Sequence, residues 1–303
     1  MKLGPVSPAV RVESLDQEGR GIAHLDGKVI FIEGALTGET VEYVSFQRRP
    51  SYELAEAKRI IRASVSRVQP RCRYFGVCGG CSMQHLEPRA QVAAKQRVLE
   101  DNLARIGKVT PETILSPIHG PTWQYRYRAR FSARYVAKKG TLVGFRERRS
   151  SFVVDMQTCE VVPARTSALL IPLRELIASL SIRERVPQIE LAIGDAVDVL
   201  VLRVIEPPDE SDLEKLRQFS SQHRVQLLLQ PKGPDSVHPL LPQEVIPLQD
   251  RIPDFDLTFP FNATDFTQVN HEINRVLVRR AMRSPGCGSS NVIALRTSTR
   301  LIS

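Results

Sequence analysis

The sequence contains no apolar run of 18 residues, so we expect no membrane-spanning helix. Met1-Lys2-Leu3 is not followed by an apolar segment of the kind that directs export. Cysteine is scarce, with five residues in 303. We therefore expect a cytoplasmic protein whose thiols stay reduced, and we do not expect a framework of disulfide bonds. Flavin and nicotinamide signatures are also absent, and Gly286-x-Gly288 follows no predicted strand, which excludes a nucleotide-binding fingerprint there.

Acidic residues are outnumbered by basic ones, 33 to 42, which gives a net charge of +9 and an isoelectric point near 9.6. Such a balance favours a polyanionic partner, and nucleic acid is the usual one. Hydrophobic residues make up 42 % of the chain and charged residues 25 %. A chain of this length and composition can build packed cores in about two domains.

Three of the five cysteines, Cys72, Cys78 and Cys81, lie within ten residues, and Cys159 lies far downstream. This pattern outlines a metal site with four thiolate ligands. An iron–sulfur cluster uses four thiolates. A structural zinc ion is an alternative, with His85 or Cys159 as the fourth ligand, and so are buried cysteines without a common role. The spacing alone indicates a metal without deciding which one.

The first 63 residues read as short strands separated by turns. Apolar runs at 9–13, 21–24, 28–32 and 39–45 are punctuated by glycines, and Asp26-Gly27 is typical of a hairpin turn. Strands at this spacing predict a small closed barrel.

After this region, helical and strand patterns alternate, which predicts an α+β domain. The expected helices are 88–106, 169–180, 211–220 (with Ser211 as N-cap) and one that ends at Arg283; the expected strands are 125–135, 152–162 (which delivers Cys159), two around Gly194-Asp195 within 188–204, and 225–229.

The basic residues concentrate between Pro121 and Ser150, a stretch that contains nine of them and a single acidic residue, Glu147. Alternation along 125–135 puts aromatic and small residues on one face of a strand and arginines on the other. A row of guanidinium groups is a good track for an RNA backbone, although an ordinary solvated face has the same pattern. The predicted RNA-binding residues on this strand and the following hairpin are Arg126, Arg128, Arg130, Arg134, Arg146 and Arg148.

Several long motifs resemble the bacterial 23S rRNA (uracil-C5)-methyltransferase family. Residues 18–39 resemble a TRAM domain, an OB-like RNA-binding barrel. The loop from Cys72 to Leu86, the stretch from Gly144 to Cys159, and Asp265-Phe-Thr-Gln-Val-Asn270 resemble three further motifs of the family.

The resemblance implies a function and a set of site residues. It implies methylation of a uracil C5 in 23S rRNA with S-adenosylmethionine, and a 4Fe-4S cluster on the four cysteines. It also implies that Gln268 contacts S-adenosylmethionine and that Phe266 lies beside the target base. In this chemistry a thiolate adds to uracil C6, C5 takes the methyl group, and a base removes the C5 proton.

The family pattern stops after Arg283. We expect a TRAM-like barrel at 1–63, a central α+β domain at 64–255, the start of a Rossmann-like methyltransferase domain at 256–283, and an aberrant, disordered tail at 284–303. The catalytic thiolate and base of the family have no counterpart here, and Cys287 is not assigned that role. The sequence therefore predicts a truncated, monomeric chain without activity of its own, with Ile273, Leu277 and Val278 partly exposed. A stand-alone iron–sulfur RNA-binding module and a zinc-stabilised RNA-binding protein are the alternatives.

Overall fold

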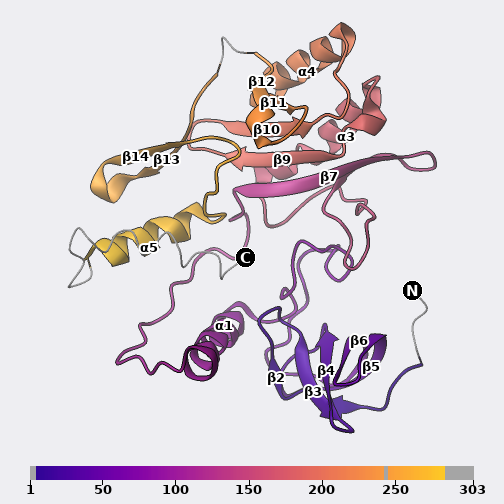
Figure 1. Cartoon of the computed structure of the whole chain (residues 1–303), viewed down its shortest axis with the longest axis vertical. Helices are drawn as coiled ribbons and strands as arrows, with labels where there is room; N and C mark the ends of the chain where they lie inside the picture. Colours follow the sequence, from indigo (N-terminus) through magenta and orange to yellow (C-terminus); the bar gives the residue numbers. More distant parts are fainter. Residues whose placement is uncertain (1–4, 242–244, 284–303) are drawn as a thin grey trace. The chain divides into compact units, whose positions relative to one another are not determined.

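The computed structural model describes residues 5–241 and 245–283, which form two compact units divided between Pro117 and Ile118 (Figure 1). The predicted domain boundaries after residues 63, 255 and 283 stay predictions. The expected disordered tail lies outside the described residues.

A six-stranded mixed sheet forms the first half of the first unit. Its strands are β1 (Val10–Arg11), β2 (Ser14–Leu15), β3 (Gly21–Leu25), β4 (Lys28–Glu33), β5 (Thr40–Arg48) and β6 (Tyr52–Arg62), in the order β1-β5-β6-β4-β3-β2. Asp26 and Gly27 both have positive φ and join β3 to β4, so the predicted hairpin is confirmed. The core of this sheet contains Val12, Ile30, Ile32 and Tyr43. Gly21 is required here, because a Cβ at this position would lie 2.8 Å from the Val12 side chain.

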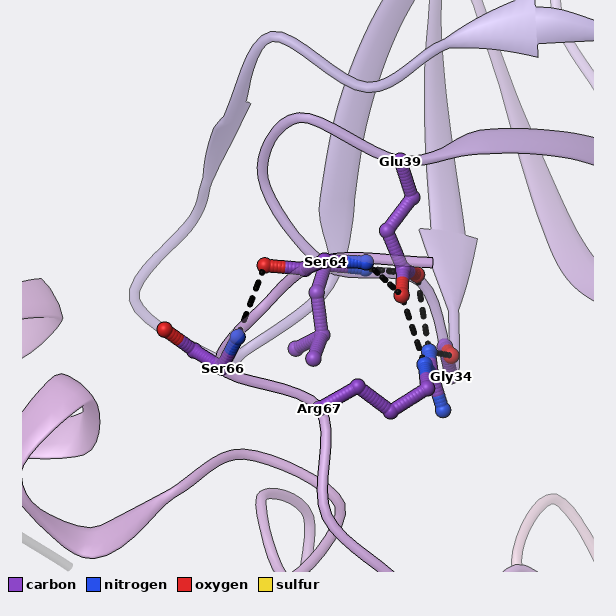
Figure 2. Close-up of polar contacts among 6 residues, drawn as sticks. Gly34, Glu39, Ser64, Ser66 and Arg67 are labelled. Atoms are coloured by element: carbon purple, nitrogen blue, oxygen red, sulfur yellow. Dashed lines mark hydrogen bonds and ion pairs between the residues drawn. The ribbon is translucent and has the colours of Figure 1, made fainter. Parts of the chain in front are cut away.

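A buried ion pair joins this sheet to the chain that leaves it. Glu39 is fully buried and accepts hydrogen bonds from the Arg67 guanidinium at 2.6 and 2.8 Å and from the backbone N–H groups of Leu36 and Ser64 (Figure 2). Arg67 also donates to the carbonyl oxygen of Gly34 at 2.6 Å. Burial alone would raise the pKa of Glu39, but these hydrogen bonds outweigh it and lower the pKa. The pair fixes where residues 64–67 depart from the sheet.

The second half of the first unit holds the cysteine loop and helix α1 (Pro88–Asn102). Glu87 caps the helix by accepting a hydrogen bond from the Ala90 N–H. The helix continues into a π-helical turn, Leu103–Gly107, and ends at Lys108, which has left-handed geometry. The prediction of a helix over 88–106 is therefore confirmed, with a widened last turn.

A second six-stranded sheet organises the second unit. Its strands are β7 (Arg128–Val136), β8 (Gly140–Gly144), β9 (Gln188–Ile193), β10 (Asp198–Arg203), β11 (Val225–Gln230) and β12 (His238–Pro239), in the order β12-β11-β10-β9-β7-β8. Only β10 and β11 run parallel. The helices of this part are α2 (Ala164–Ser167), α3 (Leu170–Ser179) and α4 (Glu210–His223), with 3-10 turns at Arg183–Arg185 and Pro234–Ser236. Helix α3 packs on β8, α4 packs on β11, and the two helices touch (Figure 1).

A hairpin and a terminal helix complete the described chain. The hairpin consists of β13 (Leu248–Ile252) and β14 (Leu257–Phe261), joined by a 3-10 turn at Pro253–Phe255, and the helix is α5 (His271–Arg283). Leu248 packs against Ala192, Val197 and Val199 of the second sheet. On α5, Leu277 is exposed while Ile273 and Val278 are half-buried, as expected. In the part of the chain that the structure describes, no helix is long and apolar enough to cross a membrane.

Two local predictions are wrong. Residues 152–162 form no strand apart from one bridge between Arg146 and Val153, because their backbone hydrogen bonds go to two separate stretches, 145–147 at one end and 124–126 at the other. Helix α4 is capped by Asp209 rather than Ser211: the Asp209 carboxylate accepts from the Asp212 N–H at 2.8 Å. The cap therefore lies two residues before the predicted one, and the Asp212 carboxylate instead accepts hydrogen bonds from the N–H and the hydroxyl of Ser181.

Replacing Arg67 by Ala should destabilise the first unit by about 3–5 kcal/mol, because it leaves the Glu39 carboxylate buried without its counter-charge. Urea denaturation of the full chain measures the effect. The matched control is Arg59→Ala, which removes an exposed guanidinium paired with Glu42 and should change stability little. Equal effects of the two substitutions would contradict the structural role of the buried pair.

Candidate nucleic-acid interface

The segment from Gln124, whose φ is +56°, to Tyr127 is hydrogen-bonded on both edges. The N–H groups of Gln124 and Arg126 donate to the carbonyl oxygens of Glu160 and Val161 at 3.0 and 2.8 Å. On the other edge, the Tyr127 N–H donates to the Val269 carbonyl oxygen at 2.7 Å, and the Tyr127 carbonyl oxygen accepts from Ile193. The segment therefore joins the stretch around Cys159, the second sheet and the approach to α5.

Strand β7 continues this segment with the alternation that the sequence predicts. Ala129, Phe131 and Ala133 are buried, and the Phe131 ring lies 5.0 Å from that of Phe145. Arg130 and Arg134 are exposed on the opposite face. The alternation is confirmed from Arg128 to Arg134.

Two of the predicted RNA-binding arginines are used within the fold. The Arg126 guanidinium lies over the Phe145 ring, 5.2 Å from the ring centre, and its Nε donates to the Arg128 carbonyl oxygen. Arg128 is half-buried and donates to the carbonyl oxygens of Ala263, at 2.6 Å, and Asp265. Burial lowers the pKa of Arg128, against the opposing influence of nearby acids. The Arg126 guanidinium therefore contacts the Phe145 ring, and the Arg128 guanidinium holds the backbone at Ala263 and Asp265.

The remaining arginines present more of their charge to solvent. The side chain of Arg130 is 67 % exposed and pairs with Glu190 at 3.0 Å. Arg134 is exposed farther along β7, and exposed Arg146 donates to Ser132 Oγ at 3.2 Å across the hairpin. Arg148 is half-buried on the turn that follows β8. The cationic face is therefore narrower than the sequence predicts and is centred on Arg130, Arg134 and Arg146.

The loop that carries Phe266 and Gln268 is fixed at both ends. Arg128 holds its first half, and the Asp265 carboxylate accepts from the backbone N–H of Asn262 at 2.7 Å. Its last residues are held by the Val269 bond to Tyr127 and by the Asn270 side chain, which caps α5 at Ile273. Between these anchors Phe266 is 74 % exposed and Gln268 is half-buried.

Helix α5 begins at His271, whose ring is buried against Tyr127. The two rings stack with their centres 4.6 Å apart. Burial lowers the pKa of His271, and the Asp250 carboxylate, 3.9 Å from Nδ1, only partly opposes this. One turn later, Arg275 forms ion pairs with Asp195 at 2.9 Å and with Asp250 at 3.1 Å. These contacts fix the start of α5 beside Tyr127.

The cysteines occupy both units. Cys78 is buried and Cys72 and Cys81 are half-buried in the first unit, on a loop that turns at Gly76 with a φ of +92°. Cys159 is buried in the second unit, where its N–H donates to Ser167 Oγ at 2.8 Å. Among residues 5–241 and 245–283, no group of three or more His, Cys, Asp or Glu side chains is arranged to hold a metal ion. The four-thiolate ligand set stays a prediction.

A cavity of about 330 Å³ lies beside residues 123–127, which we call the aromatic segment. It lies entirely within the second unit. Its lining residues come from three stretches of the chain: Pro121, Trp123, Gln124, Tyr125, Tyr127, Pro163, Ala164, Arg165, Asn270 and Glu272. The sequence prediction included none of them as site residues. The alternation through Tyr125 and Tyr127, extended back by one step to Trp123, was the signal that could have found the aromatic wall.

Comparison with known proteins identifies the relationships of the chain. Residues 9–42 match the TRAM domain family. The 23S rRNA (uracil(1939)-C(5))-methyltransferase RlmD of Nitrosospira multiformis is 59 % identical over 274 residues, which cover 90 % of this chain and 62 % of that protein. RlmD of Cupriavidus pinatubonensis is 58 % identical over 283 residues, covering 91 % of this chain and 61 % of that protein.

The chain is a relative of the RlmD methyltransferases. This confirms the resemblance seen in the sequence. The chain spans about three-fifths of the length of these curated relatives. The crystal structure of Pyrococcus abyssi tRNA (uracil-54, C5)-methyltransferase with S-adenosyl-L-homocysteine has the same fold, with a TM-score of 0.62 and 19 % identity, over 90 % of this chain and 64 % of that one.

Acidification should destabilise the second unit through His271. Because the pKa of folded His271 lies below its ordinary value of 6.5, the unfolded chain binds the proton more readily, and stability falls as the pH drops below that value. We expect His271→Phe, whose ring can stack on Tyr127 without charging, to flatten the dependence of Tm on pH between about 7 and about 5. Calorimetry across this range checks the prediction. The control, His238→Gln, alters an exposed histidine and should keep the wild-type slope; a wild-type slope in His271→Phe would contradict the assignment.

Proposed function

We propose that this chain is the RNA-binding part of an S-adenosylmethionine-dependent uracil-C5 methyltransferase that acts on 23S rRNA. The relatives named above carry this activity in their names, and the neighbouring solved structure is a uracil-C5 methyltransferase crystallised with the product form of the methyl donor. The amino-terminal sheet, which contains the TRAM match, is proposed as an OB-like barrel that adds to the RNA contacts. A monomeric state and a cytoplasmic location stay predictions.

The exposed arginines of β7 and its hairpin are the observation that carries the RNA-binding proposal. Arg130, Arg134 and Arg146 stand on one side of a strand whose other side is buried in the core, so the backbone that presents them is rigid. Arg130 now pairs with the Glu190 carboxylate. A phosphate that takes the place of this carboxylate would accept two hydrogen bonds from the Arg130 guanidinium, which presents a planar fork of donors. A strand that displays cations at alternate positions suits the regular spacing of phosphates in RNA.

The loop from Asn262 to Asn270 is proposed to meet the target base and the methyl donor. Phe266 offers an exposed ring on which an unstacked uracil can lie, and Gln268 offers an amide for the cofactor. Arg128 and the Asp265 carboxylate fix this loop before any ligand arrives, which reduces the entropy lost on binding. This assignment rests on the resemblance and on the exposure of Phe266.

Cys72, Cys78, Cys81 and Cys159 are proposed as ligands of a 4Fe-4S cluster. The support is their spacing in the sequence and the resemblance, since the described side chains form no group arranged for a metal. With these four cysteines assigned to ligands, no described cysteine remains to add to uracil C6. We therefore expect the 303-residue chain to transfer no methyl group by itself, which an assay with labelled S-adenosylmethionine and a uracil-containing rRNA fragment decides.

Replacing Arg130 and Arg134 together by Ala should weaken RNA binding and reduce its salt dependence. Each lost contact with a single-stranded phosphate lowers the slope of log K against log salt by about 0.7, so the double variant should lose about 1.4. Fluorescence anisotropy of a labelled rRNA fragment at several salt concentrations measures the slope. The double variant Arg185→Ala/Arg217→Ala removes two surface charges elsewhere on the second unit and is the control. If both variants keep the wild-type slope, RNA does not bind to β7.

Anaerobically purified protein should be brown and contain about four irons per chain, as four thiolates hold one 4Fe-4S cluster. Changing Cys81 to Ser should remove most of the iron and the visible absorbance. The Ser variant of Cys287, which lies outside the proposed ligand set, should keep both. Stoichiometric zinc without visible absorbance would contradict the iron–sulfur assignment and favour a structural zinc site.

A further inference from the structure

The cavity beside the aromatic segment is closed in by three parts of the second unit. One wall is the stretch from Pro121 to Tyr127, the second is Pro163 to Arg165 at the start of α2, and the third is the start of α5 at Asn270 and Glu272. The first and third walls are in close contact, since a Cβ on Gly120 would lie 2.8 Å from the Ile273 side chain. A volume of about 330 Å³ is at the lower end of the range for sites that bind small molecules. It is large enough for one nucleotide base with its sugar.

The first wall is aromatic and rigid. Trp123, Tyr125 and Tyr127 all line the cavity, and the backbone bends between the first two at Gln124, whose φ is +56°. The backbone bonds to Glu160, Val161 and Val269 hold this stretch on both edges. The ring of Tyr127 is in turn supported from behind by the buried ring of His271. These aromatic surfaces are therefore in position before a ligand binds.

The other two walls supply both hydrogen-bond donors and hydrogen-bond acceptors. Arg165 is held by a bidentate pair with the buried Asp198 carboxylate, at 2.8 and 2.9 Å, which uses two of its five N–H donors. The Asn270 side-chain oxygen is occupied by the helix cap, so its amide N–H groups remain as donors. Glu272 is exposed and offers an acceptor. The one cation of the lining is already paired with Asp198 and Glu272 is an anion, so the cavity carries no net positive charge.

We propose that this cavity is a subsite for one unstacked base of the RNA substrate, separate from the place of the target uracil at Phe266. A base has a flat π face that stacks on an aromatic wall and an edge that carries both donors and acceptors. The absence of net positive charge favours a neutral base over a phosphate, which we expect on the arginines of β7. The inference rests on the proposed RNA-binding function and adds to it a second point at which the substrate is recognised.

The chain contains a single tryptophan, Trp123, so its fluorescence reports this cavity alone. Titration of the intact chain with a single-stranded oligoribonucleotide should quench the emission as a base stacks on the indole. The matched ligand is an abasic oligomer with the same number of phosphates, which should bind through its backbone and leave the emission nearly unchanged. S-adenosylmethionine alone is the third ligand, because its adenine could stack in the same way, and we expect no quenching from it.

Affinity measurements on two substitutions provide a second readout that does not depend on tryptophan emission. Trp123→Ala should weaken binding of the labelled oligoribonucleotide by about 5- to 150-fold, the range found when a stacking ring is removed. Trp123→Phe keeps an aromatic ring and should retain most of the affinity. Both variants should bind the abasic oligomer as well as the wild type does, and equal binding of this oligomer also shows that they are folded.

The possible outcomes separate this inference from the function on which it rests. If RNA binds with the predicted salt dependence but neither quenches Trp123 nor loses affinity in Trp123→Ala, the subsite is wrong and the RNA-binding function stands. Quenching by S-adenosylmethionine with none by RNA would assign the cavity to the methyl donor and overturn the inference. If the wild type binds neither oligomer, the proposed function fails and the subsite fails with it.

Discussion

The second unit depends on one short segment, from Gln124 to Tyr127, whose two edges are both hydrogen-bonded. Residues far apart in the sequence, Glu160 and Val161 on one edge and Ile193 and Val269 on the other, meet there. In an extended chain successive N–H groups point in opposite directions, so a short segment can join two neighbours. Its side chains then divide into an aromatic row that faces a cavity and an arginine row that continues on β7.

Arginine has two roles in this unit, and burial separates them. Arg128 is half-buried and holds the carbonyl oxygens of Ala263 and Asp265, so that its charge fixes the loop that presents Phe266. Arg130 and Arg134, at alternate positions of the same strand, keep their guanidinium groups toward solvent. A single alternating sequence therefore builds both the support of the loop proposed to bind the base and the arginine face proposed to bind phosphate.

Much of this fold could be predicted from local patterns. The Asp26-Gly27 turn, the helix that starts at Pro88 and the alternation of β7 all follow from backbone preferences that neighbouring residues determine. What the sequence could not reveal depends on partners far along the chain. The use of Arg128 depends on residues more than 130 positions away, and the stretch 152–162 divides its backbone hydrogen bonds between two separate neighbours instead of pairing as one strand. The cavity escaped prediction for the same reason, since Trp123, Arg165 and Glu272 come together only in the folded unit.

The central claim is that one surface of the second unit receives RNA through cations on β7 and through the aromatic cavity. Ultraviolet crosslinking of an rRNA fragment to the intact chain, with mass spectrometry of the joined peptides, tests it most directly. The account predicts crosslinks to Trp123 or Tyr125 and to Phe266, together with protection of the β7–β8 hairpin from protease. Crosslinks confined to helices α3 and α4, which pack on the same sheet, would contradict it.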